Sequence, residues 1–387
     1  MMKENALAAS ISKKIVESAS LGWYKDNFGN KHTAACISFL DYMAICLYDA
    51  EYGYYRSGAV RIGREGDFYT SSAIGQVLAQ VLASFALDYA RTIDESLSLV
   101  EWGAGTGRLS AQIVEAGTMR TENWKRKYKS VLVEDHPAHR DAARHVFSQI
   151  ASELGSETLF VSSNEAWESE WLKQPALVFA NELFDAFPVH RVQNVEGELW
   201  ELGVAYSEAK GFYEVCMPLT DSRITSWLSR DGIVLREGQQ TEIHAGAAEF
   251  LDRLGSVMTR GRLVIIDYGH ESAEYAAEHR MLGTLLCYSR HQASSSPYVR
   301  IGEQDITSHV PFTFIRHAAV QSGWQVTSYA TQKQFLMEHG VMELLQNHQS
   351  TDPFSAEART NRAIRQLLLS DEMSETFKVM VLDKKLL

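Results

Sequence analysis

The sequence predicts an α/β protein in which helices cover both faces of a mostly parallel sheet. Short apolar runs alternate with helical segments along residues 93–387, as they do in chains that wind a parallel sheet. Residues 176–180 form a continuous apolar run, which is typical of a strand buried on both faces. A glycine-rich turn at residues 103–107 joins a predicted strand to a predicted helix. The chain has 387 residues, 45% of them hydrophobic, so it can bury a core of this kind.

The N-terminal part predicts helices and a loop. Residues 1–20 alternate charged and apolar side chains as an amphipathic helix does, and residues 37–48 predict a short buried helix. Residues 49–72 are rich in Gly, Tyr and Arg and predict a loop, after which an apolar helix follows. We therefore expect residues 1–92 to be a helical and loop region that caps the active site, ahead of a catalytic domain at residues 93–387.

The sheet is expected to have seven strands. They are predicted at residues 97–102, 130–133, 158–161, 176–180, 262–266, 324–330 and 377–382. The last two predict an antiparallel pair at the edge of the sheet.

Two insertions lie outside a minimal core. Residues 188–217 alternate apolar and polar positions and predict an antiparallel hairpin or a three-stranded meander, and residues 269–310 form a long polar excursion of the kind that serves as a lid or substrate-binding piece.

Composition and charge restrict the classes of partner. The formal net charge of -12 disfavours a general phosphate-binding surface and favours a neutral or basic protein partner. No basic stripe interleaved with aromatic residues is present, which disfavours nucleic acid. The four cysteines lie far apart without metal-ligand spacing, so we expect reduced thiols and no metal site. No apolar run approaches the length of about 18 residues that crosses a membrane, and no signal peptide is recognised, so we expect a cytoplasmic protein without a membrane partner.

The turn after the first strand of the sheet has the features of a cofactor site. The positions where a ligand can approach the backbone at the start of a helix are Gly103, Ala104, Gly105 and Gly107. A dinucleotide fingerprint counted from Gly103 requires Gly or Ala at its sixth position, where this chain has Arg108. Glu101 precedes the turn; it would oppose a pyrophosphate, whereas it suits the cationic end of S-adenosylmethionine. A plain tight turn is the alternative.

A second acidic residue ends the next predicted strand. Glu134 lies where carboxylates accept both hydroxyls of a ribose, although it comes later than the usual spacing of ~20 residues. The polar run at residues 118–129 supplies the extra length. A solvated charge at a strand end is the alternative.

The predicted central strand continues into the block at residues 181–188, which begins with polar residues. Because this block follows a buried strand beside the glycine turn, we expect substrate and cofactor to meet there. Methyl transfer depends mainly on positioning an in-line nucleophile. Glu182 and Asp185 could hold a guanidinium by paired hydrogen bonds while one of them receives the released proton, and Asn181 is a candidate for both catalysis and cofactor binding. Capping of the strand end by Asn181 and Asp185 is the alternative.

Taken together, these residues resemble the MidA-type methyltransferases, relatives of the mitochondrial complex I assembly factor that methylates a protein arginine. The matching blocks span most of the chain and are residues 51–55, 66–71, 103–107, Val133 and Glu134 with Arg140, 181–190, 267–269, 283–285, Tyr288, His291 and 305–310. The resemblance implies a Rossmann-like class I methyltransferase fold. It implies S-adenosyl-L-methionine as the cofactor, bound at the Gly103 turn, Glu134, Asn181 and Thr70. It also implies symmetric dimethylation of arginine in a protein substrate.

The chain departs from the family pattern at five positions. Ser72 and Ala73 stand where the family usually has Pro-Glu, Ala79 replaces a glycine, Leu286 replaces an Arg and Pro311 replaces an Asp. The lost charges concern substrate recognition or activity more than cofactor binding, whose residues are retained. Two other functions therefore stay open: a cofactor-binding assembly or chaperone-like factor with weak or no activity, and a small-molecule methyltransferase.

Three histidines are further candidates for a catalytic base. They are His190, His291 and His309. A lone histidine is more often a hydrogen-bonded structural group, and that interpretation is the alternative for each.

Overall fold

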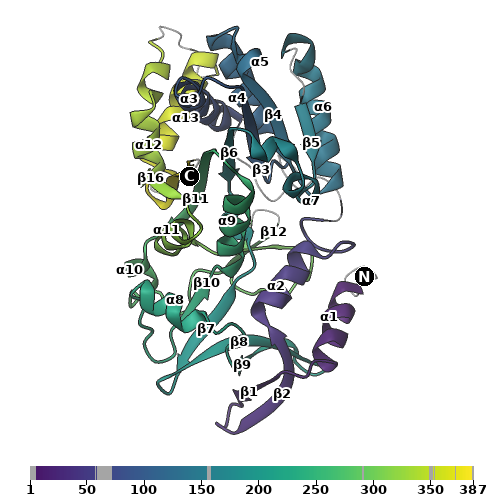
Figure 1. Ribbon diagram of the computed structural model, residues 1–387. Coiled ribbons are helices and arrows are strands. Elements are labelled where there is room, and N and C mark those ends of the chain that lie inside the picture. Colours follow the sequence, from purple (N-terminus) through teal and green to yellow (C-terminus); the bar gives the residue numbers. More distant parts are fainter. Residues whose placement is uncertain are drawn as a thin grey trace. The chain divides into compact units, whose positions relative to one another are not determined.

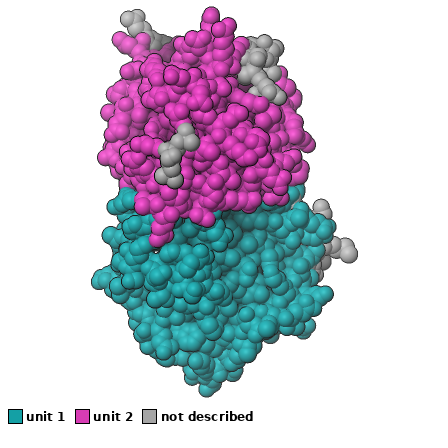
Figure 2. Space-filling model, in the orientation of Figure 1, with its two compact units in different colours: residues 1–58, 185–250, 270–318 teal, residues 59–184, 251–269, 319–387 magenta. Residues whose placement is uncertain are grey.

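The computed structural model describes residues 6–56, 58, 72–154, 158–289, 292–347, 352, 354–370 and 372–385. Its contacts divide the chain into two compact units (Figure 2). Unit 1 comprises Met1–Gly58, Asp185–Phe250 and His270–Ala318, and unit 2 comprises Ala59–Phe184, Leu251–Gly269 and Ala319–Leu387. These boundaries differ from the expected division after residue 92, and the capping role of residues 1–92 stays a prediction.

Unit 2 is built on the predicted parallel sheet (Figure 1). Its strands are β3 (Leu97–Trp102), β4 (Tyr128–Val133), β5 (Thr158–Val161), β6 (Ala176–Asn181), β11 (Gly261–His270), β16 (Gln325–Thr331) and β17 (Phe377–Lys384). They lie in the order β16-β17-β11-β6-β3-β4-β5. Neighbouring strands are parallel except that β17 is antiparallel to both β11 and β16. The predicted sheet is confirmed, and its order makes the carboxyl ends of β4, β3 and β6 neighbours.

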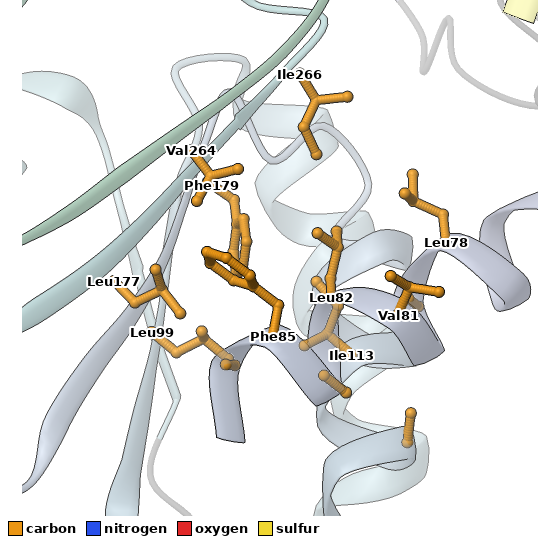
Figure 3. Close-up of a cluster of buried hydrophobic side chains, with 14 of the residues drawn as sticks. Leu78, Val81, Leu82, Phe85, Leu99, Ile113, Leu177, Phe179, Val264 and Ile266 are labelled. Carbon is orange, nitrogen blue, oxygen red and sulfur yellow. The ribbon is translucent and has the colours of Figure 1, made fainter. Parts of the chain in front are cut away.

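One face of this sheet carries the main core of unit 2 (Figure 3). Alternate strand residues point to this face, such as Leu97 and Leu99 of β3 and Leu177 and Phe179 of β6, because a strand has a period of two. The helices that pack on them are α3 (Ser72–Ala90), α4 (Arg108–Arg120), α6 (Pro137–Leu154) and α13 (Ala356–Leu369). Full burial of a side chain such as Phe179 contributes about 1.5–3 kcal/mol, so this layer fixes the strand order firmly.

Shorter helices complete unit 2. They are α5 (Trp124–Lys127), α7 (Ser163–Trp167) and α12 (Gln332–Glu338). Trp167 of α7 packs on Trp102 of β3, with ring centroids 4.3 Å apart. Two further helices, α9 (Ala245–Val257) and α11 (Phe312–Gln321), contribute residues to both units.

Unit 1 is assembled from three separate parts of the chain. Its helices are α1 (Ala6–Val16), α2 (Phe39–Tyr48), α8 (Ile224–Arg230) and α10 (Ser272–Tyr275). Its larger sheet contains β1 (Leu21–Lys25), β2 (Lys31–Ser38), β7 (His190–Val195), β8 (Glu198–Ser207), β9 (Gly211–Met217) and β10 (Gln240–Ile243). These strands are antiparallel and follow the order β10-β7-β8-β2-β1-β9, and an additional β8–β9 pairing closes β8, β2, β1 and β9 into a ring. The smaller sheet is β13 (Gln292–Ser294), β12 (Leu286–Ser289) and β14 (Asp305–Thr307).

The predicted meander at residues 188–217 is confirmed as β7, β8 and β9, and α1 and α2 are the expected N-terminal helices. Sequence analysis missed the hairpin of β1 and β2 between those helices. The turn of this hairpin is stabilised by residues close in sequence. The Asp26 carboxylate accepts the amides of Phe28 and Asn30 at 2.9 Å, and Gly29 has a φ of 84°. The two strands, however, have no clean apolar alternation, and they are stabilised by pairing with β8 and β9, which are distant in sequence.

Candidate cofactor site and active site

The glycine turn between β3 and α4 has the backbone shape that only glycine adopts easily. Gly103, Gly105 and Gly107 have φ values of 74°, 52° and 69°. The amides of Gly103 and Ala104 both donate to the carbonyl of Val133, at 2.9 and 3.0 Å, which ties the turn to the end of β4. A Cβ on Gly107 would lie 2.7 Å from Leu132 Cδ2 and 2.9 Å from the Cβ of Ala143. The turn is therefore close-packed below its exposed backbone.

Glu134 lies directly against this turn. Its carboxylate accepts the amide of Gly105 at 2.7 Å and the amide of His136 at 2.8 Å. Its side chain is 12% exposed, which excludes the solvated strand-end charge considered above. Burial raises the pKa of Glu134 to about 7. A carboxylate has about four acceptor positions, so this one can still accept ribose hydroxyls beside its two backbone amides.

Glu101 is buried beneath the start of α4. Its carboxylate accepts the amide of Ser110 at 3.1 Å and also the Ser110 hydroxyl. Burial raises the pKa of Glu101 to about 7. In this structure the side chain thus ties β3 to the first turn of α4, and its contact with the cationic end of the cofactor stays a prediction.

The block after β6 begins with a strained turn. Glu182 is exposed and has a φ of 49°, in the left-handed region that non-glycine residues rarely adopt. Its amide donates to the carbonyl of Ile266 at 2.9 Å, and the Asn181 side-chain amide reaches its carboxylate at 3.4 Å. Because β6 pairs with β3 in parallel, Asn181 and Glu182 follow the strand that borders the one leading to Gly103.

Asp267 has a role in this turn that sequence analysis missed. It is completely buried, and its carboxylate accepts the backbone amides of Phe184 and of the next residue, Tyr268, each at 2.9 Å. The signal was present in the sequence as an acidic residue directly after the apolar run at residues 262–266. Only the fold shows that this residue accepts the amide of Phe184 and so holds the block at residues 181–188.

Asp185 belongs to unit 1, whereas Glu182 belongs to unit 2. Asp185 is 4% exposed, and its carbonyl accepts the amide of Ser308 at 3.0 Å. The next carbonyl, of Ala186, accepts the hydroxyl of Tyr48 at 2.9 Å. Burial, followed by the charges of Asp305 and Asp185, holds the pKa of Tyr55 well above its ordinary value. The paired action of Glu182 and Asp185 on a guanidinium stays a prediction.

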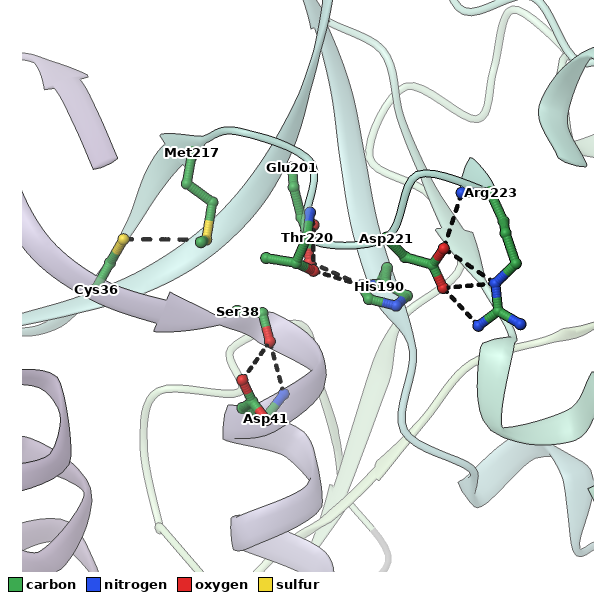
Figure 4. Close-up of polar contacts among 9 residues, drawn as sticks. All are labelled: Cys36, Ser38, Asp41, His190, Glu201, Met217, Thr220, Asp221 and Arg223. Carbon is green, nitrogen blue, oxygen red and sulfur yellow. Dashed lines mark hydrogen bonds and ion pairs between the residues drawn. The ribbon is translucent and has the colours of Figure 1, made fainter. Parts of the chain in front are cut away.

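The structure describes two of the three histidines proposed as bases, and their role as bases stays a prediction. His190 lies with its Nδ1 2.8 Å from the buried carboxylate of Glu201, whose other oxygen accepts the amide and hydroxyl of Thr220 (Figure 4). His309 is half-buried, and this burial lowers its pKa to about 4. Thr70, the whole of residues 66–71 and His291 lie outside the described residues.

The block at residues 283–285 packs against the buried side chain of Glu242. Glu242 is buried, and its carboxylate accepts the amide and hydroxyl of Thr284 at 3.0 Å each. A Cβ on Gly283 would lie 2.2 Å from a Glu242 oxygen, so this position requires glycine. Leu286 and Pro311, which replace the family's charged residues, are in β12 and β15 (Val310–Pro311), and Ala79 is completely buried in α3.

Within the ranges that the structure describes, no cluster of three or more His, Cys, Asp or Glu side chains could hold a metal ion. Over the same ranges, no helix is long and apolar enough to cross a membrane. The cysteines are free thiols, and Cys36, Cys46 and Cys287 are buried. The groups that the site offers to a ligand are the glycine backbone at residues 103–107, the buried carboxylate of Glu134 and the polar end of β6.

Comparison with known proteins identifies relatives along nearly the whole chain. The chain is 26% identical over 308 residues to "Protein arginine methyltransferase NDUFAF7 homolog, mitochondrial" of Drosophila melanogaster, covering 74% of this chain and 67% of that relative. It is 25% identical over 369 residues to "Protein arginine methyltransferase NDUFAF7, mitochondrial" of Danio rerio, covering 88% and 82%. A crystal structure from Burkholderia thailandensis, described as that of a "superfamily member and likely methyl transferase" bound to S-adenosyl-homocysteine, superposes with a TM-score of 0.82 at 30% identity, and the match covers 99% of this chain and 93% of that chain.

A family model agrees with these similarities. The model of the S-adenosyl-L-methionine-dependent methyltransferases matches residues 74–330, which contain the glycine turn, Glu134 and the residue 181–188 block. The fold class and the cofactor class that the motifs implied are thereby confirmed. The chain therefore belongs to the S-adenosyl-L-methionine-dependent methyltransferases, in the MidA-type family that its motifs resemble.

Proposed function

We propose that this protein transfers methyl groups from S-adenosyl-L-methionine to arginine side chains of a protein substrate, with symmetric dimethylarginine as the product. The observation that carries the proposal is the turn at Glu182, an exposed glutamate with a φ of 49° at the carboxyl end of β6. A left-handed backbone costs a non-glycine residue about 1–2 kcal/mol, and such strain gathers at functional sites. The printed names of the Drosophila and Danio relatives support arginine as the acceptor.

The residues of the candidate site would have separate roles in cofactor binding, acceptor binding and proton transfer. The bound cofactor supplies a methyl group on a sulfonium, which needs an in-line nucleophile. Glu134 would hold the ribose, and the Gly103 turn would admit the cofactor to its bare backbone. Glu182 would accept N–H groups of the guanidinium and draw its charge away from the attacking nitrogen. Asp185 would supply the second carboxylate, and one of the two would receive the proton that the methylated nitrogen loses.

The net charge of -12 agrees with a cationic acceptor. An acidic surface attracts a basic protein segment and raises its association rate at low ionic strength. We therefore expect methyl transfer to weaken with added salt more strongly than S-adenosyl-homocysteine binding does. Equal salt dependence would argue for a neutral, small-molecule acceptor.

The test is labelling of a cell lysate from a deletion strain with methyl-labelled cofactor, followed by mass spectrometry of methylarginine peptides. We expect a labelled protein that carries symmetric dimethylarginine with the native enzyme, and no label with Glu182→Gln. The matched control is Glu196→Gln, because Glu196 is also exposed and left-handed, with a φ of 57°, but lies in a hairpin turn between β7 and β8. Tight cofactor binding without any methylated protein would instead support an assembly factor.

A further inference from the structure

The side chain of Leu183 fills the space above Gly103. A Cβ built on Gly103 would lie 2.9 Å from Leu183 Cδ1 and 3.8 Å from both its Cβ and Cγ. These Leu183 atoms are the nearest ones to that position among the described residues. Leu183 itself is half-buried, so part of its side chain still faces outward. The residue after the strained Glu182 is thus packed against the first glycine of the cofactor turn.

Leu183 is held in this place from both sides. On one side, the amide of Glu182 donates to the carbonyl of Ile266 at 2.9 Å. On the other, the amide of Phe184 donates to the buried carboxylate of Asp267, also at 2.9 Å. Hydrogen bonds to a charged acceptor are roughly twice as strong as neutral ones. The turn at residues 182–184 is therefore clamped to the end of β11 while its central side chain covers Gly103.

We propose that Leu183 forms an apolar wall of the S-adenosyl-L-methionine site and that Asp267 is the positioning residue that holds it there. A ligand that approaches Gly103 from the side of its missing Cβ must contact Leu183, because that space is already bounded by the leucine. The same contact joins the cofactor turn to the turn that carries Glu182. Binding of the cofactor then stabilises the left-handed conformation of Glu182, since a contact that favours one state shifts the equilibrium toward it.

The inference rests on the proposed placement of the cofactor at the Gly103 turn, but it does not depend on the acceptor. Isothermal titration of the full chain with S-adenosyl-homocysteine tests it. Leu183→Ala should weaken the affinity about tenfold, because it removes apolar atoms equivalent to one to two buried methylenes. Leu183→Met, which keeps the volume, should stay within about twofold of the native protein. The matched control is Leu344→Ala, since Leu344 is also partly buried on the unit 2 core but lies in the segment Val341–Leu344, which packs on α3, α12 and α13.

Asp267 is tested through Leu183. Asp267→Asn should weaken binding several-fold, because the carboxamide cannot accept both amides that the carboxylate accepts. In the double variant, Leu183→Ala should add less than twofold to the effect of Asp267→Asn, since both changes remove one interaction. Hydrogen exchange supplies a readout independent of affinity: S-adenosyl-homocysteine should slow exchange at the amides of Glu182 and Phe184 in the native protein and not in Leu183→Ala.

The results separate this inference from the placement on which it rests. If Leu183→Ala binds S-adenosyl-homocysteine as the native protein does while Glu134→Gln binds it weakly, the wall is disproved and the site is kept. If both variants bind as the native protein does, the cofactor lies elsewhere. Independent, multiplying effects of Leu183→Ala and Asp267→Asn would overturn the positioning role of Asp267.

Discussion

Replacing Glu182 with glycine should make the protein more stable and inactive. Glu182 has a φ of 49°, and its side chain is exposed, where polar contacts contribute typically about 0–1 kcal/mol. Glycine removes a backbone cost of about 1–2 kcal/mol for a left-handed residue. It adds about 0.5–1 kcal/mol of conformational entropy to the unfolded chain. Because the 3.4 Å contact with Asn181 is long and exposed, its loss changes this balance little.

The expected net effect is a stabilisation of about 0.5–1 kcal/mol, which corresponds to a rise in Tm of roughly 1 °C for a chain of 387 residues. Urea unfolding and differential scanning calorimetry measure the stability, and methylarginine formation measures the activity. Glu196→Gly is the control, because Glu196 has the same residue type, a φ of 57° and only an exposed ion pair with Lys25 to lose. It should be neutral or stabilising and fully active.

Two outcomes would refute this reasoning. A Glu182→Gly protein that is less stable than the native one by more than about 1 kcal/mol would show that the glutamate side chain supports the fold, since a cost of that size needs a lost interaction. A Glu182→Gly protein with native activity would show that the strained carboxylate has no part in the chemistry. Either result would remove the observation on which the proposed function depends.

Three further predictions follow from the buried groups. Burial raises the pKa of Glu134 from 4.5 to about 7, so the folded state binds the proton more tightly than the unfolded state does. The free energy of unfolding should therefore fall as pH rises from about 4.5 to 7. Glu134→Gln should reduce this loss of stability in urea unfolding measured at pH 5 and pH 8. Gly107→Ala should destabilise the protein by at least about 1–3 kcal/mol, because Gly107 has a φ of 69° and an added Cβ would lie 2.7 Å from Leu132. Thermal unfolding measures this, and an unchanged Tm would contradict the prediction. Glu201→Gln should lower stability by about 1–3 kcal/mol, because the buried network of His190 and Thr220 loses an acceptor, yet it should leave the kcat of the folded fraction near native. A selective fall in kcat would support His190 as a base.

Much of the sheet could be predicted because its signals are local. The run Leu97–Trp102 and the run Thr158–Val161 were assigned with the bounds that the structure shows, since a short buried strand with flanking turn residues has few other readings. The hairpin of β1 and β2 was missed for the opposite reason. Its residues alternate poorly, and partners that lie far along the chain stabilise it.

The sequence by itself determined the strands of the parallel sheet, the glycine turn and the acidic residues that follow it, because periodicity and turn chemistry act over a few residues. Tertiary structure alone decided what those acidic residues do. Glu134 meets the amide of Gly105 across 29 residues, and Asp267 meets the amide of Phe184 across 83 residues. No local pattern records which backbone amide a carboxylate will find, because that pairing depends on strand order, and strand order is set by packing of the whole core.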